Sequence, residues 1–467
     1  MNLKLVIGIH NTEKHINISI HNTDMEFSKL VEQNLWWKDK SLIERDYDIE
    51  KWKGKKYSWV PEIINEIDLR PFALHIILGP RQSGKTTALK LFIRELLKRI
   101  EPRSIFYFNC DEIADYKELL DIIETYLTFK GDNHIESSII FLDEITSPKE
   151  WYRAIKSLID KGKLKKDVVV LTGSSSIAIK REVELFPGRR GNGKDFVLFP
   201  LSFREFLKVI NPALYDKIEP IKNLDDLEEK ASRAMPYIEE LNQEMKRYFN
   251  YGGFPLGIEA IGKGKNEAKT AYLSWIKTSI LKTGRNDTIA RQILKALLEK
   301  MPSAISWESI SKEIEIKSPK TVAAYVDLFK SMFALIVLYN IDISRKKIKF
   351  GKNKKVHVLD PLLLEILEDW CLISIKNKES ILAESVFAIH LSRLFPERLF
   401  FWKNKFEVDA VVLIKNEVYG FEVKWSEKPE AKKLPQFKKF ILITKKDFSK
   451  NPLVIPLSVL LSILNIW

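Results

Sequence analysis

The sequence predicts an α/β protein with a parallel-sheet core and a second, smaller α/β domain near the end of the chain. Three observations carry this prediction. A glycine-rich loop at residues 79–86 stands between an apolar run and a helical pattern, further apolar runs alternate with helical patterns up to residue 199, and a strand–turn–strand pair follows at residues 406–424. Apolar runs without polar alternation are typical of strands buried on both faces of a parallel sheet.

The loop at residues 79–86 reads GPRQSGKT and matches the phosphate-binding pattern G-x-x-x-x-G-K-[ST]. Ala73 to Leu78 read as the strand before it, and Thr87 to Lys98 read as the helix after it. Backbone N–H groups of such a loop bind phosphates together with the helix N-terminus. Lys85 neutralises phosphate charge and Thr86 offers its hydroxyl to Mg²⁺, so ATP and Mg²⁺ are the expected ligands. The expected nucleotide contacts are Gly79, Pro80, Arg81, Gln82, Ser83, Gly84, Lys85, Thr86 and Thr87.

An acidic pair at the end of a later apolar run completes this site. Ser138 to Leu142 read as a strand buried on both faces with Asp143 and Glu144 directly after it, and Arg103 to Asn109 read as another buried strand in between. We expect Asp143 to hold Mg²⁺, directly or through water, and Glu144 to polarise the attacking water. The pair therefore predicts ATP hydrolysis and not only nucleotide binding.

A further apolar run, Asp167 to Leu171, leads into a polar segment at residues 172–176 (TGSSS). A polar side chain at this strand end is placed to touch the γ-phosphate or the attacking water. Ser174 is the first candidate for this sensor role and Thr172 is the second. The segment is equally typical of a serine-rich turn that caps the next helix, and both interpretations stay open.

The chain carries, in this order, the segments NLWWKDK, YSWVPEIINEIDL, GPRQSGKTT, FNCDEI, FLDEI, LTGSSS, PGRR, FPLSFREFL and YGGFP. In them it resembles the archaeal AAA-type P-loop ATPases with a C-terminal winged helix and a restriction-endonuclease-like PD-(D/E)xK domain of unassigned function. The resemblance starts near residue 34, and the first thirty or so residues read as a short strand-rich extension. It implies an N-terminal extension over 1–70, an AAA-type ATPase core over 71–201, a helical lid over 202–285, a winged helix over 286–360 and a restriction-endonuclease-like domain over 361–467.

Residues 187–190 read PGRR and precede a fifth predicted strand, Phe196 to Phe199. Ring-forming ATPases of this type present an arginine finger at this position to the γ-phosphate held by a neighbouring subunit. Arg189 and Arg190 are the candidates, and a finger in this role implies a homo-oligomeric ring. Two exposed arginines beside glycines are also typical of an ordinary basic loop.

The segment from Leu201 to Gly284 is mostly helical in pattern and corresponds to the lid over the nucleotide in such ATPases. Residues 251–255 (YGGFP) interrupt the helices, either as a hinge or as a packed turn. No sensor-two arginine stands out, although Arg233 and Arg247 are candidates on lid helices. How the nucleotide state reaches the lid therefore stays open.

Three helical patterns and a basic hairpin predict a winged helix. The expected helices are Ile289 to Lys300, Trp307 to Ile314 and Lys320 to Phe333, and the expected strands are Ile336 to Ile341 and Val356 to Val358. Residues 345–355, between these strands, hold seven cations and no acid. The third helix would enter the DNA major groove, and the hairpin, with Lys346, Lys347, Lys354 and Lys355, would contact phosphates. The alternatives are a solvated face or protein contacts.

A second set of chemical residues follows on a predicted strand pair, Phe406 to Ile414 and Val418 to Lys424. Asp409 stands on the first strand, and Glu422 and Lys424 share one face of the second. This is the D…ExK arrangement of restriction-type nucleases, in which carboxylates bind Mg²⁺ or Mn²⁺ and the lysine acts on the phosphate or the hydroxide. Glu384, on a helix predicted before the strands, matches the family's additional acidic ligand. Such modules also occur as binding modules that cut nothing.

The composition agrees with a multidomain cytoplasmic protein. The chain has 467 residues, a formal net charge of +13 and two cysteines, Cys110 and Cys371, which cannot form a disulfide framework or a zinc site. No leader pattern stands at the N-terminus, and the longest apolar stretch, Ile455 to Trp467, is too short to span a bilayer, so we expect no membrane contact. The positive charge makes DNA the expected macromolecular partner.

Two functions from different classes are compatible with these residues. The first is an ATP-driven DNA-processing enzyme, in which hydrolysis moves the winged helix and nuclease-like modules over DNA and metal-dependent cleavage follows. The second is an ATP-gated switch or scaffold, in which the nucleotide state sets the affinity for DNA or for a protein and nothing is cut. The D…ExK residues favour the first, and the absence of a recognisable helicase motif favours the second.

Overall fold

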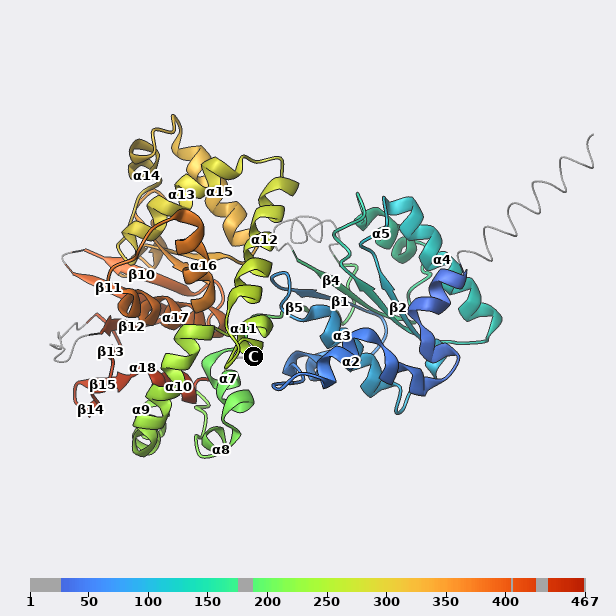
Figure 1. Ribbon diagram of the computed structural model, residues 1–467, viewed down its shortest axis with the longest axis horizontal. Helices are drawn as coiled ribbons and strands as arrows, with labels where there is room; N and C mark the ends of the chain where they lie inside the picture. The colour runs from blue at the N-terminus through green and yellow to red at the C-terminus, as the bar shows by residue number, and fades with distance from the viewer. Residues whose placement is uncertain (1–26, 175–187, 405, 426–435, 466–467) are drawn as a thin grey trace, which may run out of the picture. The chain divides into compact units, whose positions relative to one another are not determined.

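The computed structural model describes residues 27–174, 188–404, 406–425 and 436–465, which divide into two compact units (Figure 1). The core unit holds the residues up to 198, except 56–59 and 80–83. The C-terminal unit holds those two short segments and the residues from 199 onward. The strand-rich extension predicted for the first thirty residues falls largely outside the described ranges.

The core unit contains a five-stranded sheet with the order β2-β3-β4-β1-β5, and every neighbouring pair is parallel. This confirms the predicted parallel-sheet α/β core. The strands are β1 (Ala73–Leu78), β2 (Ile105–Asn109), β3 (Ile139–Asp143), β4 (Val168–Gly173) and β5 (Asp195–Val197). All residues of β1, β3 and β4 are buried, as their continuous apolar runs predict. Because the strands are parallel, the ends of β1, β3 and β4 that carry the functional residues meet at one edge.

The helices of the core unit have apolar residues at helical spacing and bury that side of each helix. They are α3 (Lys85–Leu96), α4 (Tyr116–Asp132) and α5 (Tyr152–Asp160). The helix α4 starts at a side-chain cap, because Asp115 accepts hydrogen bonds from the backbone N–H groups of Lys117 and Glu118. Short helical elements precede the sheet: residues 27–33, η1 (Leu35–Trp37), η2 (Lys40–Arg45), α2 (Tyr47–Lys53) and η3 (Glu62–Glu66).

Side chains from the segment that precedes the sheet bond to strand β2. The amide of Asn34 accepts from the backbone N–H of Tyr107 at 2.7 Å and donates to its carbonyl at 2.8 Å. The indole N–H groups of Trp36 and Trp37 both donate to the carbonyl of Ile105, at 3.0 and 2.9 Å. The sequence segment NLWWKDK therefore serves as a set of partners for β2.

The C-terminal unit begins with helices that the sequence predicts as a lid and continues with three helices and two antiparallel strand pairs. The first helices are α7 (Phe203–Ile210), α8 (Pro212–Tyr215), α9 (Leu227–Ala234), η5 (Met235–Tyr237), α10 (Ile238–Tyr251), α11 (Pro255–Glu259) and α12 (Asn266–Lys282). The next elements are α13 (Asp287–Lys300), α14 (Trp307–Glu313), α15 (Pro319–Ser331), β6 (Leu335–Tyr339) paired with β9 (Lys354–Val358), and β7 (Ile341–Asp342) paired with β8 (Lys347–Ile348). The three helices and the strands β6 and β9 overlap the predicted ranges, but β9 begins two residues earlier than predicted and β8 lies within the basic stretch.

A six-stranded mixed sheet follows, with the order β10-β11-β12-β13-β15-β14. Its strands are β10 (Leu399–Lys403), β11 (Glu407–Ile414), β12 (Glu417–Lys424), β13 (Lys439–Thr444), β14 (Ser449–Lys450) and β15 (Leu453–Pro456). The pairs β12–β13 and β13–β15 are parallel, and the others are antiparallel. The remaining helices are α16 (Pro361–Cys371), α17 (Lys378–Leu394) and α18 (Leu457–Ile463).

One hydrophobic core joins the predicted lid helices to this mixed sheet. Phe206 and Tyr248 from the lid helices belong to the same buried cluster as Phe387 of α17 and Phe421 of β12. The predicted lid and the predicted restriction-endonuclease-like segment therefore fold as parts of one compact unit.

The YGGFP segment is a packed turn within this unit. Gly252 has φ 67°, and a Cβ atom there would lie 1.9 Å from Oδ1 of Asp360. The backbone N–H of Gly253 donates to Oδ2 of Asp360 at 2.7 Å, and its carbonyl accepts from the N–H of Leu201 at 2.9 Å. Position 252 therefore requires a positive φ and no Cβ atom, and only glycine meets both requirements.

Candidate functional site

The phosphate loop connects β1 to α3 through a left-handed turn. Gly84 has φ 92° and stands directly before the first residue of α3, and Gln82 has φ 58°. Glycine adopts this conformation without steric cost, which explains the second glycine of the motif. The hydroxyl oxygen of Ser83 is buried and has no hydrogen-bond partner among the residues that the structure describes. The loop thus offers the N-terminus of a twelve-residue helix and an unsatisfied hydroxyl to a ligand.

Lys85 is buried at the first turn of α3. Its Nζ atom lies 3.2 Å from the carbonyl oxygen of Gly79 and 3.5 Å from Oε1 of Glu144. Only 3 % of the side chain is exposed, and a buried ammonium needs an anionic partner. The Glu144 carboxylate is one such partner, and a phosphate bound in the loop would be a second, so the position of Lys85 suits the role predicted for it.

Asp143, at the end of β3, collects three hydroxyl groups. Its Oδ2 accepts from Thr86 Oγ1 at 2.6 Å and from the Tyr107 hydroxyl at 3.1 Å, and its Oδ1 accepts from Thr172 Oγ1. The carboxylate is fully buried and forms no ion pair within the described part of the chain. The two residues predicted to hold Mg²⁺, Thr86 and Asp143, are therefore in contact, and their oxygens are the ligand type that Mg²⁺ prefers.

Tyr107 is a site residue that the sequence motifs did not predict. It lies on β2, next to β3, and its hydroxyl reaches Asp143 from the neighbouring strand. Burial and the nearby Asp143 carboxylate raise the pKa of Tyr107 well above its usual range, so the hydroxyl stays a donor. The ammonium of Lys90 lies 3.6 Å from the ring centroid and packs on it. The hydroxyl group of Tyr107 within the apolar run Ile105 to Phe108 was the available signal.

Glu144 has a strained backbone and an unsatisfied carboxylate oxygen. Its φ angle is 49°, in the left-handed region that residues other than glycine rarely adopt. The strain is held in place by its N–H, which donates to Thr172 Oγ1 at 3.0 Å. Oε1 faces Lys85, and Oε2 is buried without a hydrogen-bond partner among the described residues. Strain of this kind collects at functional sites, where it fixes the direction of a side chain.

The two sensor candidates differ in what they contact. Thr172, the second choice, is the fully buried residue that bonds to Asp143 and to the backbone of Glu144. Ser174, the first choice, is half-buried one residue after the end of β4. Residues 175 and 176 of the polar segment lie outside the described ranges. Thr172 thus fixes both residues of the acidic pair, and a sensor role for Ser174 or for Thr172 stays a prediction.

The arginines proposed as fingers or sensors all have acidic partners inside their own unit. Arg189 bonds to Asp160 at 2.6 Å, and Arg190 bonds to Asp195 at 2.6 Å and to the carbonyl of Leu74 near the start of β1. The two arginines therefore lie near the amino-terminal end of β1, whereas the phosphate loop of the same chain follows its carboxyl-terminal end. In the C-terminal unit the ion pairs are Arg233 with Glu219 and Glu229, and Arg247 with Glu244. A finger that acts on a neighbouring subunit stays a prediction.

The basic hairpin is exposed in its first half and buried in its second. Lys346 and Lys347 are exposed, as are Arg345, Lys349 and Lys352. Lys354 and Lys355 are buried in β9, with 7 % and 1 % of their surfaces exposed. The ammonium of Lys354 lies 5.3 Å from the ring centroid of Trp307. The prediction that Lys354 and Lys355 contact DNA phosphates is therefore wrong, because both side chains face the interior of the unit.

Lys355 lies among the carboxylates predicted to bind a metal in the C-terminal unit. Its Nζ atom is 2.7 Å from Oε1 of Glu384, 2.6 Å from Oδ1 of Asp409 and 2.9 Å from Oε1 of Glu407. Burial alone would lower the pKa of Lys355, but the three carboxylates raise it above its usual value, so the side chain stays charged. Glu384 and Asp409 do come together as predicted, but an ammonium stands between them.

Glu422 and Lys424 pair with each other at the end of β12, with 2.6 Å between Lys424 Nζ and Glu422 Oε1. Asp409 uses its second oxygen to accept from the N–H of Val423 at 2.8 Å. No group of three or more His, Cys, Asp or Glu side chains in the described ranges is arranged to hold a metal ion. The predicted metal site of Glu384, Asp409 and Glu422 therefore does not fit a divalent cation while Lys355 occupies it.

Comparisons with known proteins agree with this geometry for the core. Residues 72–207 match a family described as an AAA domain, and residues 379–458 match one described as a domain of unknown function (DUF4143). The first match spans the sheet, the phosphate loop and the Asp143–Glu144 pair, so these residues form an AAA-type P-loop domain. The second match spans α17 and the mixed sheet, and it assigns no activity to them.

The chain is also similar to an uncharacterized protein of Methanocaldococcus jannaschii, with 28% identity over 329 residues. The alignment covers 67% of this chain and 64% of the relative's length. Among solved structures, the ORC2 protein of Aeropyrum pernix matches with 14% identity and a TM-score of 0.36, over 64% of this chain and 88% of the other. A single-residue variant of Thermotoga maritima RuvB matches with 15% identity and a TM-score of 0.24, over 56% of this chain and 81% of the other.

No helix in the described ranges is both long enough and apolar enough to cross a bilayer.

Proposed function

We propose that the protein is a Mg²⁺-dependent ATPase that binds DNA and couples ATP hydrolysis to DNA processing. The observation that carries the ATPase part is the assembly of Lys85, Thr86, Asp143 and Glu144 at one edge of the parallel sheet, within residues that match an AAA domain. In open parallel sheets, ligands bind outside the carboxyl ends of the strands. The arrangement would supply phosphate binding, a magnesium position and a water-activating carboxylate in one place, and this supports the proposal.

Each of these residues has a separate role in the proposed reaction. Mg²⁺ bound with ATP neutralises charge on the β- and γ-phosphates. Thr86 and Asp143 would hold the ion through oxygen ligands, after giving up the hydrogen bond that now joins them. The backbone of residues 79–86 and the ammonium of Lys85 hold the phosphates. Glu144 accepts a hydrogen bond from the attacking water through its unsatisfied Oε2. The hydroxyl of Thr172 accepts from the backbone N–H of Glu144 and fixes the position of that backbone.

The substitution Glu144→Gln tests the water-activating role. We expect the variant to bind ATP as the wild type does and to lose hydrolysis by about 100- to 1,000-fold, because the amide cannot polarise water. Nucleotide binding is measured by titration with a fluorescent ATP analogue, and hydrolysis by release of phosphate. Glu150→Gln, an exposed residue paired with Arg153, serves as the control and keeps full activity. Loss of ATP binding in Glu144→Gln would contradict the role.

The proposed DNA binding is supported by charge and by element order. The chain has a formal net charge of +13, and five cations are exposed on the hairpin: Arg345, Lys346, Lys347, Lys349 and Lys352. They follow α13, α14 and α15 in the order that a winged helix requires, so we assign residues 286–360 to that fold. Exposed cations beside a helix that can enter a groove contribute affinity that depends on salt and little on sequence.

Neutralising Lys346 and Lys347 together tests this assignment. We expect weaker binding to unrelated duplexes by similar factors, and a plot of log affinity against log salt whose slope is less steep by about 0.9 for each phosphate that the variant no longer neutralises. Fluorescence anisotropy with two duplexes of different sequence measures both. Neutralising Lys165 and Lys166, two exposed lysines of the core unit, is the matched control. An unchanged slope in the hairpin variant would show that the hairpin is a solvated face that does not contact DNA.

The second candidate function, an ATP-gated DNA- or protein-binding switch that cuts nothing, is favoured by Lys355. Its ammonium lies between Glu384 and Asp409, two of the three residues predicted to hold the metal, and it also contacts Glu407. We therefore expect no cleavage of labelled duplex, single-stranded or branched DNA in Mg²⁺ or Mn²⁺. Cleavage that disappears in Asp409→Ala would contradict this expectation and restore the nuclease activity predicted from the D…ExK residues.

A further inference from the structure

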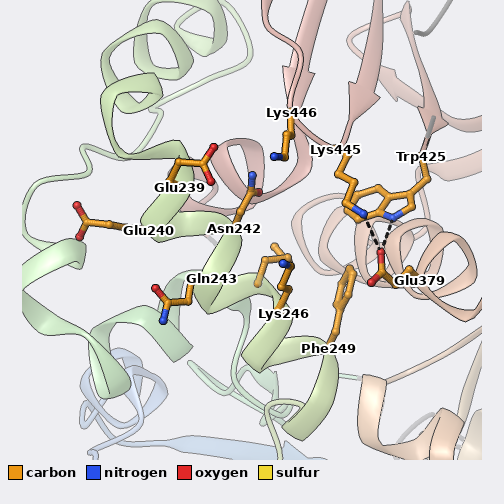
Figure 2. A pocket seen from close by; sticks show the side chains of 11 residues that line it. Glu239, Glu240, Asn242, Gln243, Lys246, Phe249, Glu379, Trp425, Lys445 and Lys446 are labelled. Atoms are coloured by element: carbon orange, nitrogen blue, oxygen red, sulfur yellow. Dashed lines mark hydrogen bonds and ion pairs between the residues drawn. The ribbon is translucent and has the colours of Figure 1, made fainter. Parts of the chain in front are cut away.

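A cavity of about 380 Å³ lies within the C-terminal unit, between α10 and the ends of β12 and β13 (Figure 2). The two strands are parallel, with Lys424 opposite Thr444, and the cavity opens just beyond their carboxyl ends. That is the edge of a parallel sheet where ligands bind. The volume is in the range of about 300–1,000 Å³ that is typical of small-molecule sites. Its residues belong neither to the phosphate loop nor to the Lys355 cluster.

One wall of the cavity is a fixed aromatic pair. The rings of Trp425 and Phe249 lie with their centroids 5.9 Å apart. The indole N–H of Trp425 donates to Oε2 of Glu379 at 3.1 Å, and Lys445 Nζ bonds to the same oxygen at 3.0 Å. These two hydrogen bonds lower the pKa of Glu379, so the carboxylate stays ionised and its charge is compensated by Lys445. The indole is thereby held in one orientation, as a stacking surface for a planar ligand requires.

Two cations of the lining are available to an anion. Lys246 and Lys446 are exposed, and neither forms an ion pair with any residue that the structure describes. In the view of Figure 2 they lie between the aromatic pair on one side and Glu239 and Glu240 on the other. Aromatic surface and cations therefore lie on adjoining parts of one cavity.

The lining also contains an unsatisfied amide. Oδ1 of Asn242 accepts from the hydroxyl of Ser458 at 2.6 Å, which fixes the orientation of the amide. Nδ2 of Asn242 is buried and has no acceptor among the described residues. Buried donors without a partner are rare in folded proteins, and a carbonyl oxygen of a ligand can satisfy this one.

We propose that this cavity binds one unpaired nucleotide, with its base against Trp425 and Phe249 and its phosphate between Lys246 and Lys446. Bases stack on aromatic side chains whatever their identity, and their carbonyl groups can accept from Asn242. The inference rests on the proposed DNA binding and adds that the preferred DNA contains unpaired residues. The same chemistry fits a free mononucleotide, and the experiment separates the two sources.

The test compares three labelled DNAs and one mononucleotide on the full chain. Fluorescence anisotropy gives the affinity for a single strand, for a duplex with an unpaired overhang and for a blunt duplex, and dTMP is added as a competitor. In Trp425→Leu we expect affinity for the single strand and the overhang to fall by about 5- to 100-fold, with the blunt duplex unchanged. Trp425→Phe, which keeps an aromatic ring, should retain most of the affinity.

The exposed lysines give a second test that does not disturb the packed wall. Lys246→Gln with Lys446→Gln should make the salt slope for single strands less steep by about 0.7 for each phosphate that is no longer neutralised. Lys165→Gln with Lys166→Gln, two exposed lysines of the core unit, is the matched control. If dTMP competes with the single strand and Trp425→Leu abolishes this competition, the cavity binds a free nucleotide. If the wild type prefers the single strand and dTMP does not compete, the cavity binds a nucleotide of a DNA strand.

Failure of nucleotide binding in the cavity can be told apart from failure of DNA binding by the whole chain. If the Trp425→Leu variant and the double variant Lys246→Gln with Lys446→Gln bind every DNA and dTMP as the wild type does, the cavity does not bind nucleotides. The proposed DNA binding by the whole chain would still stand. Equal losses for the blunt duplex and the single strand also overturn the requirement for an unpaired base. If the wild type binds neither DNA nor dTMP, both proposals fall.

Discussion

The two units each bring lysines and carboxylates together, and they neutralise the negative charge in different ways. In the core unit, Asp143 is bound by the hydroxyl groups of Thr86, Tyr107 and Thr172. In the C-terminal unit, Asp409 and Glu384 are bound by the ammonium of Lys355. Hydroxyl groups orient a carboxylate and leave its charge in place, whereas an ammonium cancels it.

A set of acidic residues therefore does not by itself identify a metal site. A carboxylate held by hydroxyl groups keeps its attraction for a divalent cation, because the neutral donors can be exchanged for it. A carboxylate held by a buried ammonium already has its counter-charge, and a cation must displace that ammonium. Asp143 thus suits the binding of Mg²⁺ with ATP, and Asp409 suits a permanent internal ion pair.

The largest effect is expected from removing the internal cation. Lys355→Met leaves Glu384 and Asp409 without the ammonium that lies between them, whereas Glu407 keeps its pair with Lys403, so the free energy of unfolding should fall by about 3–5 kcal/mol. Mn²⁺ should raise the unfolding midpoint of the variant by more than that of the wild type, because both proteins keep Asp143 but only the variant leaves Glu384 and Asp409 without an ammonium. Thermal unfolding with and without Mn²⁺ measures both.

The control for this variant is Lys403→Met. Lys403 pairs with Glu407 at 2.7 Å but is nearly half exposed, and exposed pairs contribute about 0.2–1 kcal/mol. If Mn²⁺ stabilises the wild type as strongly as Lys355→Met, the internal ion pair does not exclude the metal and the comparison between the two sites fails.

The next effect concerns the lysine of the core unit. Lys85→Ala should reduce ATP hydrolysis by about 100- to 1,000-fold and weaken ATP binding, because phosphate charge loses its buried partner. Lys424→Ala, which breaks the pair with Glu422, is the control and should leave ATP hydrolysis unchanged. Steady-state kinetics with both variants separates the roles of the two lysines. Equal losses of ATPase activity in the two variants would contradict the division of roles.

A smaller effect is expected from pH. Burial and the nearby Arg393 lower the pKa of His390 to about 3, from a usual value of 6.5. The unfolded chain therefore binds a proton below pH 6.5 that the folded chain refuses until about pH 3, so stability is full above pH 6.5 and is lost as the pH falls between these values. The slope contributed is at most about 1.4 kcal/mol per pH unit.

The measurement compares urea unfolding of the wild type and His390→Gln between pH 4 and 7. The difference in unfolding free energy between them should shrink as the pH falls. Comparing the two proteins cancels the opposite contribution of Asp360, whose pKa burial raises to about 6. His134→Gln, at an exposed position, is the control, and a difference that does not vary with pH would show that His390 titrates normally.

The smallest effect tests the hydroxyl shell of Asp143. Tyr107→Phe removes one donor to the carboxylate, so ATP hydrolysis should fall by about 5- to 10-fold, the equivalent of a single hydrogen bond of ~1 kcal/mol. Tyr126→Phe removes a hydroxyl that bonds to the carbonyl of Arg103 and should leave the activity unchanged. Phosphate release by the two variants decides whether Tyr107 acts on the site or only on packing.

The core site could be predicted from sequence because its residues follow strands. Lys85 and Thr86 stand at a fixed distance from two glycines, and Asp143 ends an apolar run, so a parallel sheet brings them to one edge. Tyr107 escaped prediction because it comes from the middle of a third strand, and only the register of β2 against β3 places its hydroxyl at Asp143. Order along the chain predicts which strand ends meet, and register decides which other side chains reach them.

Lys355 escaped for a different reason. It belongs to a run of cations, and such a run is typical of a solvated hairpin. Only the fold shows that β9 is buried along its whole length and that Lys355 meets residues 29 and 54 positions away. Charge counts describe a segment, whereas the partner of each charge depends on contacts that no local pattern contains.

The hydrogen bonds of Asn34, Trp36 and Trp37 have a consequence for self-association. Strand β2 is the last strand of the core sheet, and the backbone groups of Tyr107 and Ile105 on its outer side bond to these side chains. A bare edge strand can pair with another copy of the chain and start aggregation. The side chains of Asn34, Trp36 and Trp37 occupy these backbone groups and cannot themselves be extended by another strand. The core sheet therefore cannot continue at this position into the sheet of a second copy of the chain.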